Sequence, residues 1–217
     1  MPDQPSSLRA RRRAETQRTI QAHAVRLFTE RGYDATTIAA VADAAGVSPM
    51  TVYRSFPTKE DLVLLDQRDR LVAERIAASP TAQPLVRRIG AALIESAARL
   101  TGRDPGDDLT TDEQFLLARV QLMISTPALR AKHLDSNYAL QQAIVDALGD
   151  DGGDPDTAFH AHAAASACLA AMHTALVRWA ESDGRAELPD LIGQALAAAF
   201  GDNVIDPTPE DQGATTM

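Results

Sequence analysis

Cysteine, aromatic residues and long apolar runs are all scarce in this sequence. Its 217 residues include one cysteine, Cys168, which excludes an intramolecular disulfide and any zinc site built from cysteines. No run of about 18 uncharged apolar residues occurs, and residues 1–13 are polar and rich in arginine, unlike a signal peptide. We therefore expect a cytoplasmic protein that is neither secreted nor inserted into a membrane.

The residues that are abundant favour an all-α fold. Hydrophobic residues make up 45% of the chain, which is ample for a core, and alanine is the most prominent among them. Aromatic residues contribute only 4%, and no dense run of Val, Ile and Thr alternates with polar residues. Helix formers therefore dominate the apolar part of the sequence.

The net charge of −9 is unevenly distributed along the chain. Residues 1–60 hold nine basic and six acidic residues, whereas residues 61–217 hold twelve basic and twenty-four acidic ones. The net charge is thus +3 in the first segment and −12 in the second. The net charge of the whole chain argues against a negatively charged partner such as nucleic acid. The positive charge of residues 1–60 is nevertheless compatible with one.

Three helices are predicted in the basic segment. Residues 13–31 carry an apolar stripe of helical period, and a glycine follows them. Thr36 or Thr37 caps a second, short helix that Gly46 ends. Residues 48–56 begin with a serine N-cap and a proline that needs no N–H at the first helical position, so they form the third helix.

Six further helices complete the prediction. Thr58 and Asp61 form a Thr-x-x-Asp capping pattern that starts a long fourth helix, which runs towards Pro80. Glycine and proline separate the remaining helical segments, which are 83–101, 112–125, 127–149, 155–183 and 188–200. An acidic tail from residue 202 contains prolines and few apolar residues, so we expect it to be disordered.

The two short helices around Gly46 have the size that the major groove of DNA, about 12 Å wide, can accept. Two short helices joined by a glycine turn also occur in many helical bundles, so this feature alone does not indicate DNA binding. The longer string from Thr37 to Leu62 reads TIAAVADAAGVSPMTVYRSFPTKEDL. This string, together with the Leu-Phe-x-x-x-Gly-Tyr that precedes it, resembles the signature of the TetR family of transcription regulators. The resemblance covers residues 14–66.

The resemblance implies a DNA-binding role for eight residues. Six lie in the recognition helix and two, Thr37 and Lys59, match phosphate contacts of the family; the full set is Thr37, Pro49, Met50, Thr51, Tyr53, Arg54, Ser55 and Lys59. Tyr53 either reaches a phosphate or is half buried, and Arg54 contacts either a base or the backbone. Since Met50 donates no hydrogen bond, we expect few base contacts and a larger share of recognition through DNA shape.

A cluster of arginines precedes the first helix and comprises Arg9, Arg11, Arg12 and Arg13. The cluster is either an arm that enters the minor groove or lies along phosphates, or a solvated extension without contacts. Its place beside the DNA-binding segment of an otherwise acidic chain favours contact.

No metal-binding pattern is found in residues 81–200, and no catalytic motif is found in the chain. His160 and His162 are two residues apart and so point to different faces of a helix. No Gly-x-Ser-x-Gly elbow or glycine-rich phosphate loop occurs. We therefore expect neither an enzyme nor a metal or other cofactor.

The last two predicted helices are suited to dimerisation. Residues 155–183 are rich in alanine, which lets helices approach closely, and residues 188–200 carry an apolar stripe. In the TetR family these two helices form a four-helix bundle with their copies. The resemblance therefore implies a homodimer and a palindromic DNA operator.

The TetR resemblance also implies a small-molecule pocket between the fourth helix and the dimer helices. The candidate lining residues combine flexible apolar and polar side chains, although each of them is equally suited to a core: Phe115, Leu116, Arg119, Met123, His133, Tyr138, Cys168, Met172, His173 and Leu176. Residues 112–129 resemble an actinobacterial subgroup related to mycofactocin regulators, some of which sense acyl-CoA.

The sequence thus predicts four regions and one principal function. The regions are a flexible arginine-rich arm at 1–13, a helix-turn-helix domain at 14–60, a ligand-binding and dimerisation domain at 61–201, and a disordered tail at 202–217. We expect a dimeric repressor that a small molecule releases from DNA. The alternatives are an activator and a dimeric DNA-binding protein that responds to no ligand.

Overall fold

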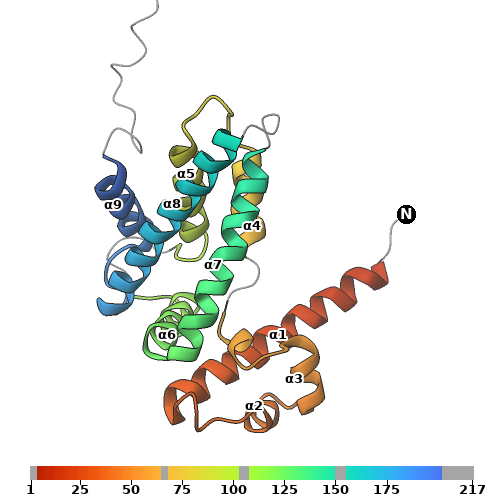
Figure 1. Cartoon of the computed structure of the whole chain (residues 1–217). Helices are drawn as coiled ribbons and strands as arrows, with labels where there is room; N and C mark the ends of the chain where they lie inside the picture. Colours follow the sequence, from red (N-terminus) through yellow and green to blue (C-terminus); the bar gives the residue numbers. More distant parts are fainter. Residues whose placement is uncertain (1–3, 65–67, 103–107, 150–154, 202–217) are drawn as a thin grey trace, which may run out of the picture. The chain divides into compact units, whose positions relative to one another are not determined.

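The computed structural model describes residues 4–64, 68–102, 108–149 and 155–201, and within them all regular secondary structure is helical (Figure 1). The predicted all-α class is confirmed, and none of the helices in these ranges is long and apolar enough to cross a membrane. The tail expected to be disordered, 202–217, lies outside the described residues. The helices are α1 (Gln4–Arg31), α2 (Ile38–Ala44), α3 (Pro49–Ser55), the 3-10 helix η1 (Glu60–Leu62), α4 (Arg68–Ala77), α5 (Leu85–Ala98), α6 (Thr111–Ser125), α7 (Pro127–Leu148), α8 (Pro155–Glu181) and α9 (Leu188–Phe200).

Helix α1 begins earlier than the sequence predicts. The apolar stripe indicated a start near Arg13, but the helix begins at Gln4, so the described part of the expected flexible arm is helical. Residues 6–31 contain neither proline nor glycine and are rich in arginine and alanine, which are strong helix formers. The apolar stripe marks where α1 becomes buried, not where it begins.

The prediction of a long fourth helix that starts at Thr58 is wrong. The Thr58–Asp61 capping pattern does form, because the Thr58 N–H donates to the Asp61 carboxylate at 2.8 Å and the Asp61 N–H to the Thr58 hydroxyl at 3.3 Å. The helix that it starts is the short η1, however, and Val63 and Leu64 after it are not helical, so η1 is not the start of the helix α4 (Arg68–Ala77). Three successive side chains at 62–64 are all buried. On an α-helix they would span an arc of about 200°, wider than the face that a surface helix buries.

The chain divides into two compact units. The first unit comprises Met1–Leu65 and Ala118–His133, and the second comprises Asp66–Leu117 and Leu134–Met217. The sequence assigned all of 61–201 to one domain. The contacts instead place the end of α6 and the start of α7 in the first unit.

The core of the first unit is built on the predicted stripe of α1. Ile20, Leu27 and Phe28 are at most 2% exposed. Val41 of α2 and Val52 of α3 are fully buried with them. Helix α2 packs against both α1 and α3, and η1 packs against α1. These contacts fix the short α2 and α3, which have too few residues to be stable alone.

The second unit is centred on α5, α8 and α9. Helix α8 packs against α5 and α9, and α4 packs against α5. Trp179, the only tryptophan, is buried on α8. Gly90 of α5 lies so close to α9 that a β-carbon there would be 3.1 Å from Leu196. Small residues thus allow close packing of these helices.

Candidate nucleic-acid interface

A tight turn around Gly46 connects α2 to α3. Gly46 has a φ of +67°, in the left-handed region that favours glycine. The Gly46 N–H donates to the Asp43 carbonyl at 3.1 Å, and the Val47 N–H donates to the Ala42 carbonyl at 3.0 Å. The Ser48 hydroxyl then accepts the Thr51 N–H at 3.2 Å, so Ser48 is the predicted N-cap of α3. The sequence therefore sets both ends of the turn.

Helix α3 has one buried and one exposed face. Val52 and Phe56 point into the core, at 0% and 5% exposure. Met50 and Tyr53 are 72% and 52% exposed, and Arg54 is exposed beside them. A single exposed apolar side chain is common on protein surfaces, but here two of them lie beside a guanidinium on one short helix. The exposed face of α3 is thus a candidate binding surface that combines apolar groups with one guanidinium.

Hydroxyl groups surround this surface. Thr37 is exposed, and its side chain caps α2 by accepting the Ala40 N–H at 3.2 Å. The Thr51 hydroxyl lies 2.9 Å from that of Ser48. Pro49 is exposed and Ser55 half-buried, also on α3. Seven of the eight residues predicted to bind DNA therefore lie on α3 or at the start of α2, and all seven are at least partly exposed.

Lys59, the eighth, has a contact within the first unit. Its ammonium group donates to the backbone carbonyl of Tyr33 and lies 4.2 Å from the centroid of the Tyr33 ring. It is also 5.4 Å from the centroid of the Phe28 ring. These cation–π and hydrogen-bond contacts hold the start of η1 against the end of α1. Sequence reasoning missed this structural role, and the phosphate contact of Lys59 stays a prediction.

Tyr33 and Glu60 form a second link between the same elements. The Tyr33 hydroxyl donates to the Glu60 carboxylate at 2.7 Å. Burial, then this bond, raises the pKa of Tyr33 above its ordinary range. Burial also opposes ionisation of Glu60, but hydrogen bonds from Tyr33, from the backbone and from Thr58 outweigh it and lower its pKa. Tyr33 is therefore a neutral donor and Glu60 a charged acceptor at neutral pH.

Two cations from α6 and α7 also bind the region around η1 within the first unit. Arg119 is buried, and its Nε donates to the Val63 carbonyl. The Lys132 ammonium lies 3.6 Å from the Asp61 carboxylate. Arg119 was predicted to line a ligand pocket, but the structure places its guanidinium against the backbone after η1. His133 and Met123, two other ligand candidates, are buried in the same unit.

The second unit contains a small, mostly apolar cavity with room for about one water molecule. Its lining comes from four helices and the residues next to them: Leu93, Ser96, Ala97, Leu100, Leu116, Met172, Leu176, Leu188 and Ile192. The Ser96 hydroxyl is buried and has no hydrogen-bond partner in the described part of the chain. A buried hydroxyl without a partner is costly, so Ser96 is the polar group most available to a bound molecule.

Two sequence models of known families match the chain. The model of the bacterial regulatory proteins of the tetR family matches residues 20–65, which contain α2, the Gly46 turn and α3. The chain belongs to the TetR family. A model of the MftR C-terminal domain matches residues 106–200, so the carboxyl-terminal domain is of the MftR type. The TetR family is one of transcriptional regulators and not of enzymes, as predicted.

Individual TetR relatives resemble the chain at low identity. The HTH-type transcriptional regulator TcmR of Streptomyces glaucescens is 28% identical over 140 residues, which is 64% of this chain and 61% of TcmR. The match thus spans less than two thirds of TcmR. NalD of Pseudomonas aeruginosa, the secondary repressor of the MexAB-OprM multidrug efflux pump, has a TM-score of 0.52 at 20% identity, covering 87% of this chain and 95% of NalD. FadR of Bacillus halodurans, a fatty acid degradation regulator, has a TM-score of 0.54 at 18% identity, and the match covers 86% of this chain and 95% of FadR.

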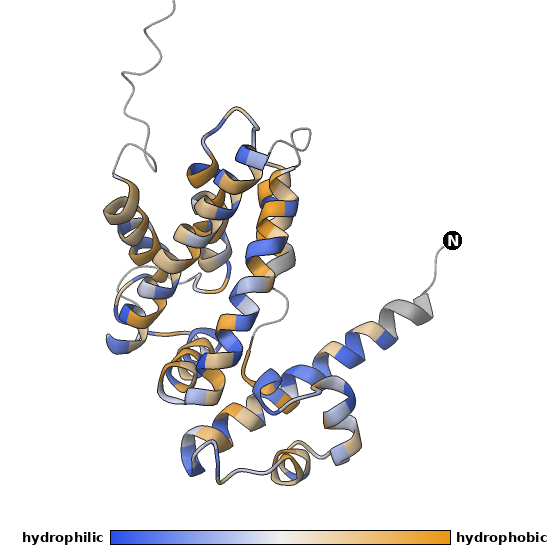
Figure 2. Ribbon diagram, in the orientation of Figure 1, coloured by the Kyte–Doolittle hydropathy of each residue, from blue (hydrophilic) through white to orange (hydrophobic). Residues whose placement is uncertain are grey.

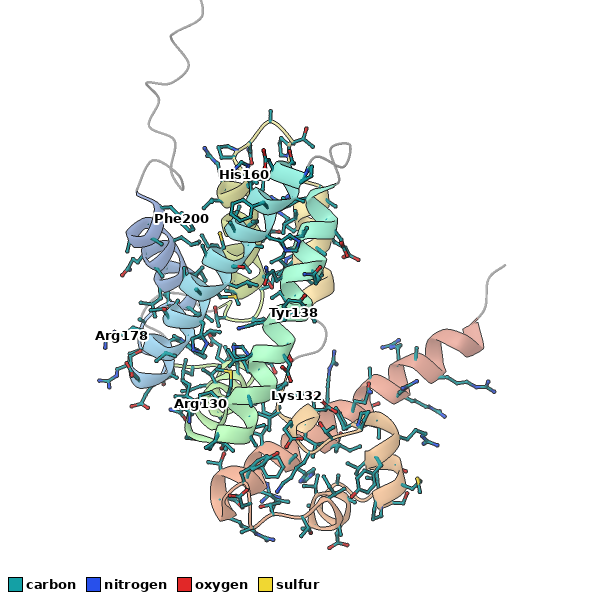
Figure 3. The ribbon with its side chains drawn as sticks, viewed as in Figure 1. Arg130, Lys132, Tyr138, His160, Arg178 and Phe200 are labelled. Carbon is teal, nitrogen blue, oxygen red and sulfur yellow. The ribbon has the colours of Figure 1, made fainter. Side chains whose placement is uncertain are left out.

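The ligand residues suggested by the TetR resemblance do not converge on one site. Leu116, Met172 and Leu176 line the cavity of the second unit. Cys168 is fully buried on α8, where burial raises the pKa of its thiol to about 12. Tyr138 projects from α7 into solvent (Figure 3).

The other candidates do not enlarge this set. Phe115 and His173 are half-buried, and neither lines the cavity. Ser96 lines it but was missed, because a single serine within an apolar helix carries no distinctive spacing. No group of three or more metal-binding side chains occurs in the described ranges.

Proposed function

We propose that this TetR family member is a cytoplasmic repressor that binds a palindromic DNA operator as a homodimer and that a small molecule releases it. The observation that carries the proposal is the exposed face of α3, where Met50, Tyr53 and Arg54 point away from a core that fixes Val52 and Phe56. A rigid helix with this face is what the major groove accepts.

The side chains of α3 suggest how the operator is read. Arg54 has the geometry to hydrogen-bond a guanine edge, and Met50 offers apolar contact to a thymine methyl group. The Tyr53 hydroxyl, on a ring that is 52% exposed, suits a phosphate oxygen. Pro49, with the hydroxyls of Thr51, Ser55 and Thr37, supplies the edge of the surface. Few of these groups donate to bases, so DNA shape carries part of the specificity.

The dimer is proposed to form through α8 and α9. Alanines 163 and 170 on α8, and 198 and 199 on α9, are exposed although they belong to largely apolar helices. Small exposed side chains allow the helices of a second copy to approach closely. Twofold symmetry then presents two copies of α3 to two half-sites of a palindrome.

The cavity gives the ligand its proposed place. Leu116 of the cavity and Arg119, which binds the Val63 carbonyl, are three residues apart on α6. A helix is a rigid element, so a displacement at one of these residues can be passed to the other. A molecule that enters the cavity must displace lining side chains, because the cavity has room for about one water. Displacing Leu116 would shift α6 and thereby change the contact of Arg119.

The size of the cavity also favours a second candidate function. A dimeric DNA-binding protein that responds to no ligand needs no pocket, and the cavity in the described residues admits only about one water molecule. Both functions share the same DNA-binding surface and the same dimer. Only the response to small molecules separates them.

DNA binding is tested by selecting bound duplexes from a random pool with the wild-type chain. Arg54→Ala should relax the base preference at one position in each half-site and cost about 1–3 kcal/mol in affinity. The control is Arg99→Ala, which removes an exposed arginine of the second unit. Failure of the wild-type chain to enrich any sequence would contradict the proposal.

The ligand response is tested with aliphatic alcohols and carboxylic acids of increasing length, which match an apolar lining with one hydroxyl. The operator affinity of the wild-type chain should fall with one length class. Ala97→Leu fills the cavity and should abolish that response while leaving operator binding intact. If no compound changes operator affinity, the second candidate function is favoured.

A further inference from the structure

Helix α1 extends well beyond the core of the first unit. Ile20 is fully buried, but every described residue from Arg9 to Thr19 is exposed or half-buried. At 1.5 Å per residue, Arg9 lies about 16 Å along the helix from Ile20. The amino-terminal end of α1 projects away from α2, α3 and η1 (Figure 1). Packing therefore does not explain why the chain keeps this extension helical.

The extension is strongly basic. Between Arg9 and Arg18 it holds five arginines and one glutamate. All five arginine side chains are exposed, and none forms an ion pair with another described residue. Figure 2 colours this part of the helix largely as hydrophilic. Like charges at helical spacing destabilise a helix, so the arginines weaken the extension unless anions neutralise them.

The helical register places these arginines on opposite faces. Arg9 and Arg13 precede Ile20 by eleven and seven residues, which at 100° per residue puts both within about 20° of its direction. Arg11 and Arg18 precede it by nine and two residues and point about 160–180° away. Ile20 belongs to the stripe by which α1 packs on α2 and η1. Arg9 and Arg13 therefore emerge on the side of α1 that faces α2 and η1.

We propose that Arg9 and Arg13 bind phosphate groups of the DNA next to the half-site that α3 reads. The inference rests on the proposed function, because α3 must enter the groove for this face of α1 to meet the DNA. Guanidinium groups bind phosphate oxygens in a bidentate manner and stay charged at any physiological pH. Two arginines one turn apart on a rigid helix present their charges at a fixed spacing to the backbone. The expected arm is thus a rigid helical rod with one DNA-facing edge.

Two double variants of the full chain provide a matched test. Arg9→Gln/Arg13→Gln and Arg11→Gln/Arg18→Gln remove the same charge from the same helix, and glutamine preserves helix propensity. Operator affinity is measured by fluorescence anisotropy over a range of salt concentrations. The first variant should bind about tenfold more weakly, and its salt slope should fall by about 4 for the dimer, roughly one for each lost contact. The second variant should change affinity less than about twofold.

Duplex length gives an independent measurement. Duplexes that end at the edge of the selected palindrome are compared with duplexes that carry additional flanking base pairs. The wild-type chain should lose affinity when the flanks are removed, and Arg9→Gln/Arg13→Gln should lose none. Equal helicity of the two variants by circular dichroism excludes an effect through unfolding of α1.

Several outcomes would overturn the proposal while leaving the proposed function intact. Equal losses in the two variants would mean that α1 has no DNA-facing edge, and no loss in either would mean that the extension does not touch DNA. Phosphatidylglycerol vesicles supply phosphate from a lipid source. If Arg9 and Arg13 were needed for vesicle binding but not for operator binding, the proposal would also fail. Loss of the proposed function is recognised separately, because the wild-type chain itself would then select no duplex.

Discussion

Within the two units, the helices are held together by different kinds of contact. The first unit is represented by Tyr33, Lys59 and Glu60, and the second by Met172, Leu176 and Ile192. The first set joins α1 to η1 by hydrogen bonds and cation–π contacts. The second set lines a cavity between helices with almost no polar group. Hydrogen bonds depend on direction, whereas apolar contacts depend mainly on contact area.

This difference matches the two tasks that we propose for the units. A surface that reads a groove must hold its side chains in one geometry, which directional contacts enforce. A unit that admits a ligand must let its side chains move aside, which Met and Leu do with little cost. If the two units are held in these different ways, substitutions in one unit should leave the other largely unchanged.

Removing one core aromatic ring should show that the two units unfold independently. Phe28→Ala leaves a cavity in the first unit and should cost about 3–5 kcal/mol of its unfolding free energy. Trp179 is the only tryptophan and lies in the second unit, so its fluorescence in urea reports that unit alone. We expect the Trp179 transition to shift little in Phe28→Ala but strongly in Ile192→Ala. Equal shifts would show that both units unfold together.

Loss of the buried Arg119 guanidinium should destabilise the first unit. Arg119→Met removes the bond to the Val63 carbonyl and should cost about 1.5–3 kcal/mol, since hydrogen bonds of charged groups are stronger than neutral ones. Amide hydrogen exchange around η1 should accelerate more than exchange in α8. Unchanged exchange around η1 would mean that Arg119 does not stabilise this part of the first unit.

The N-cap of α3 should contribute a smaller amount. Ser48→Ala removes the acceptor of the Thr51 N–H and should cost about 1 kcal/mol, whereas Ser48→Asn retains an acceptor and should cost less. Urea denaturation followed by far-ultraviolet circular dichroism measures both variants. Identical losses in the two would mean that the cap does not support α3.

The pH dependence should be the smallest effect. Folding lowers the pKa of Glu60 from its ordinary value of 4.5. Glu60 therefore stabilises the fold at a pH above 4.5, and this stabilisation is lost as the pH falls through the lowered pKa. Glu60→Gln should therefore lower stability at pH 7 more than at pH 3. Glu95 of the second unit also has a lowered pKa, caused first by Arg75, but its pair is solvent-exposed. Glu95→Gln should therefore change the pH dependence less.

The features that the sequence predicts correctly are those formed by residues close together in the chain. Ser48, Gly46 and the Thr58–Asp61 pair act within four residues of themselves, and each forms the cap or turn that its spacing indicates. The exposed face of α3 follows from the same local periodicity. Family resemblance and periodicity thus predict the exposed face of α3 as the DNA-binding surface.

Contacts between distant residues explain what was missed. Arg119 binds a carbonyl 56 residues away, and Lys59 a carbonyl 26 residues away, and no local pattern encodes either partner. The early start of α1 was missed because an unburied helix carries no apolar stripe. The apolar residues from Leu62 onward indicate one long helical face, but residues 62–64 are all buried, which a single face of an α-helix does not allow.

The burial of Cys168 has a practical consequence for spectroscopy. Its thiol is fully enclosed, and its raised pKa keeps it protonated at neutral pH, where maleimides react only with thiolates. A cysteine introduced at an exposed position outside the proposed DNA-binding surface, such as Tyr138→Cys, should therefore be labelled selectively without removing the native one. Fluorophore pairs placed in this way can report distances between two copies of the chain as operator or ligand is added.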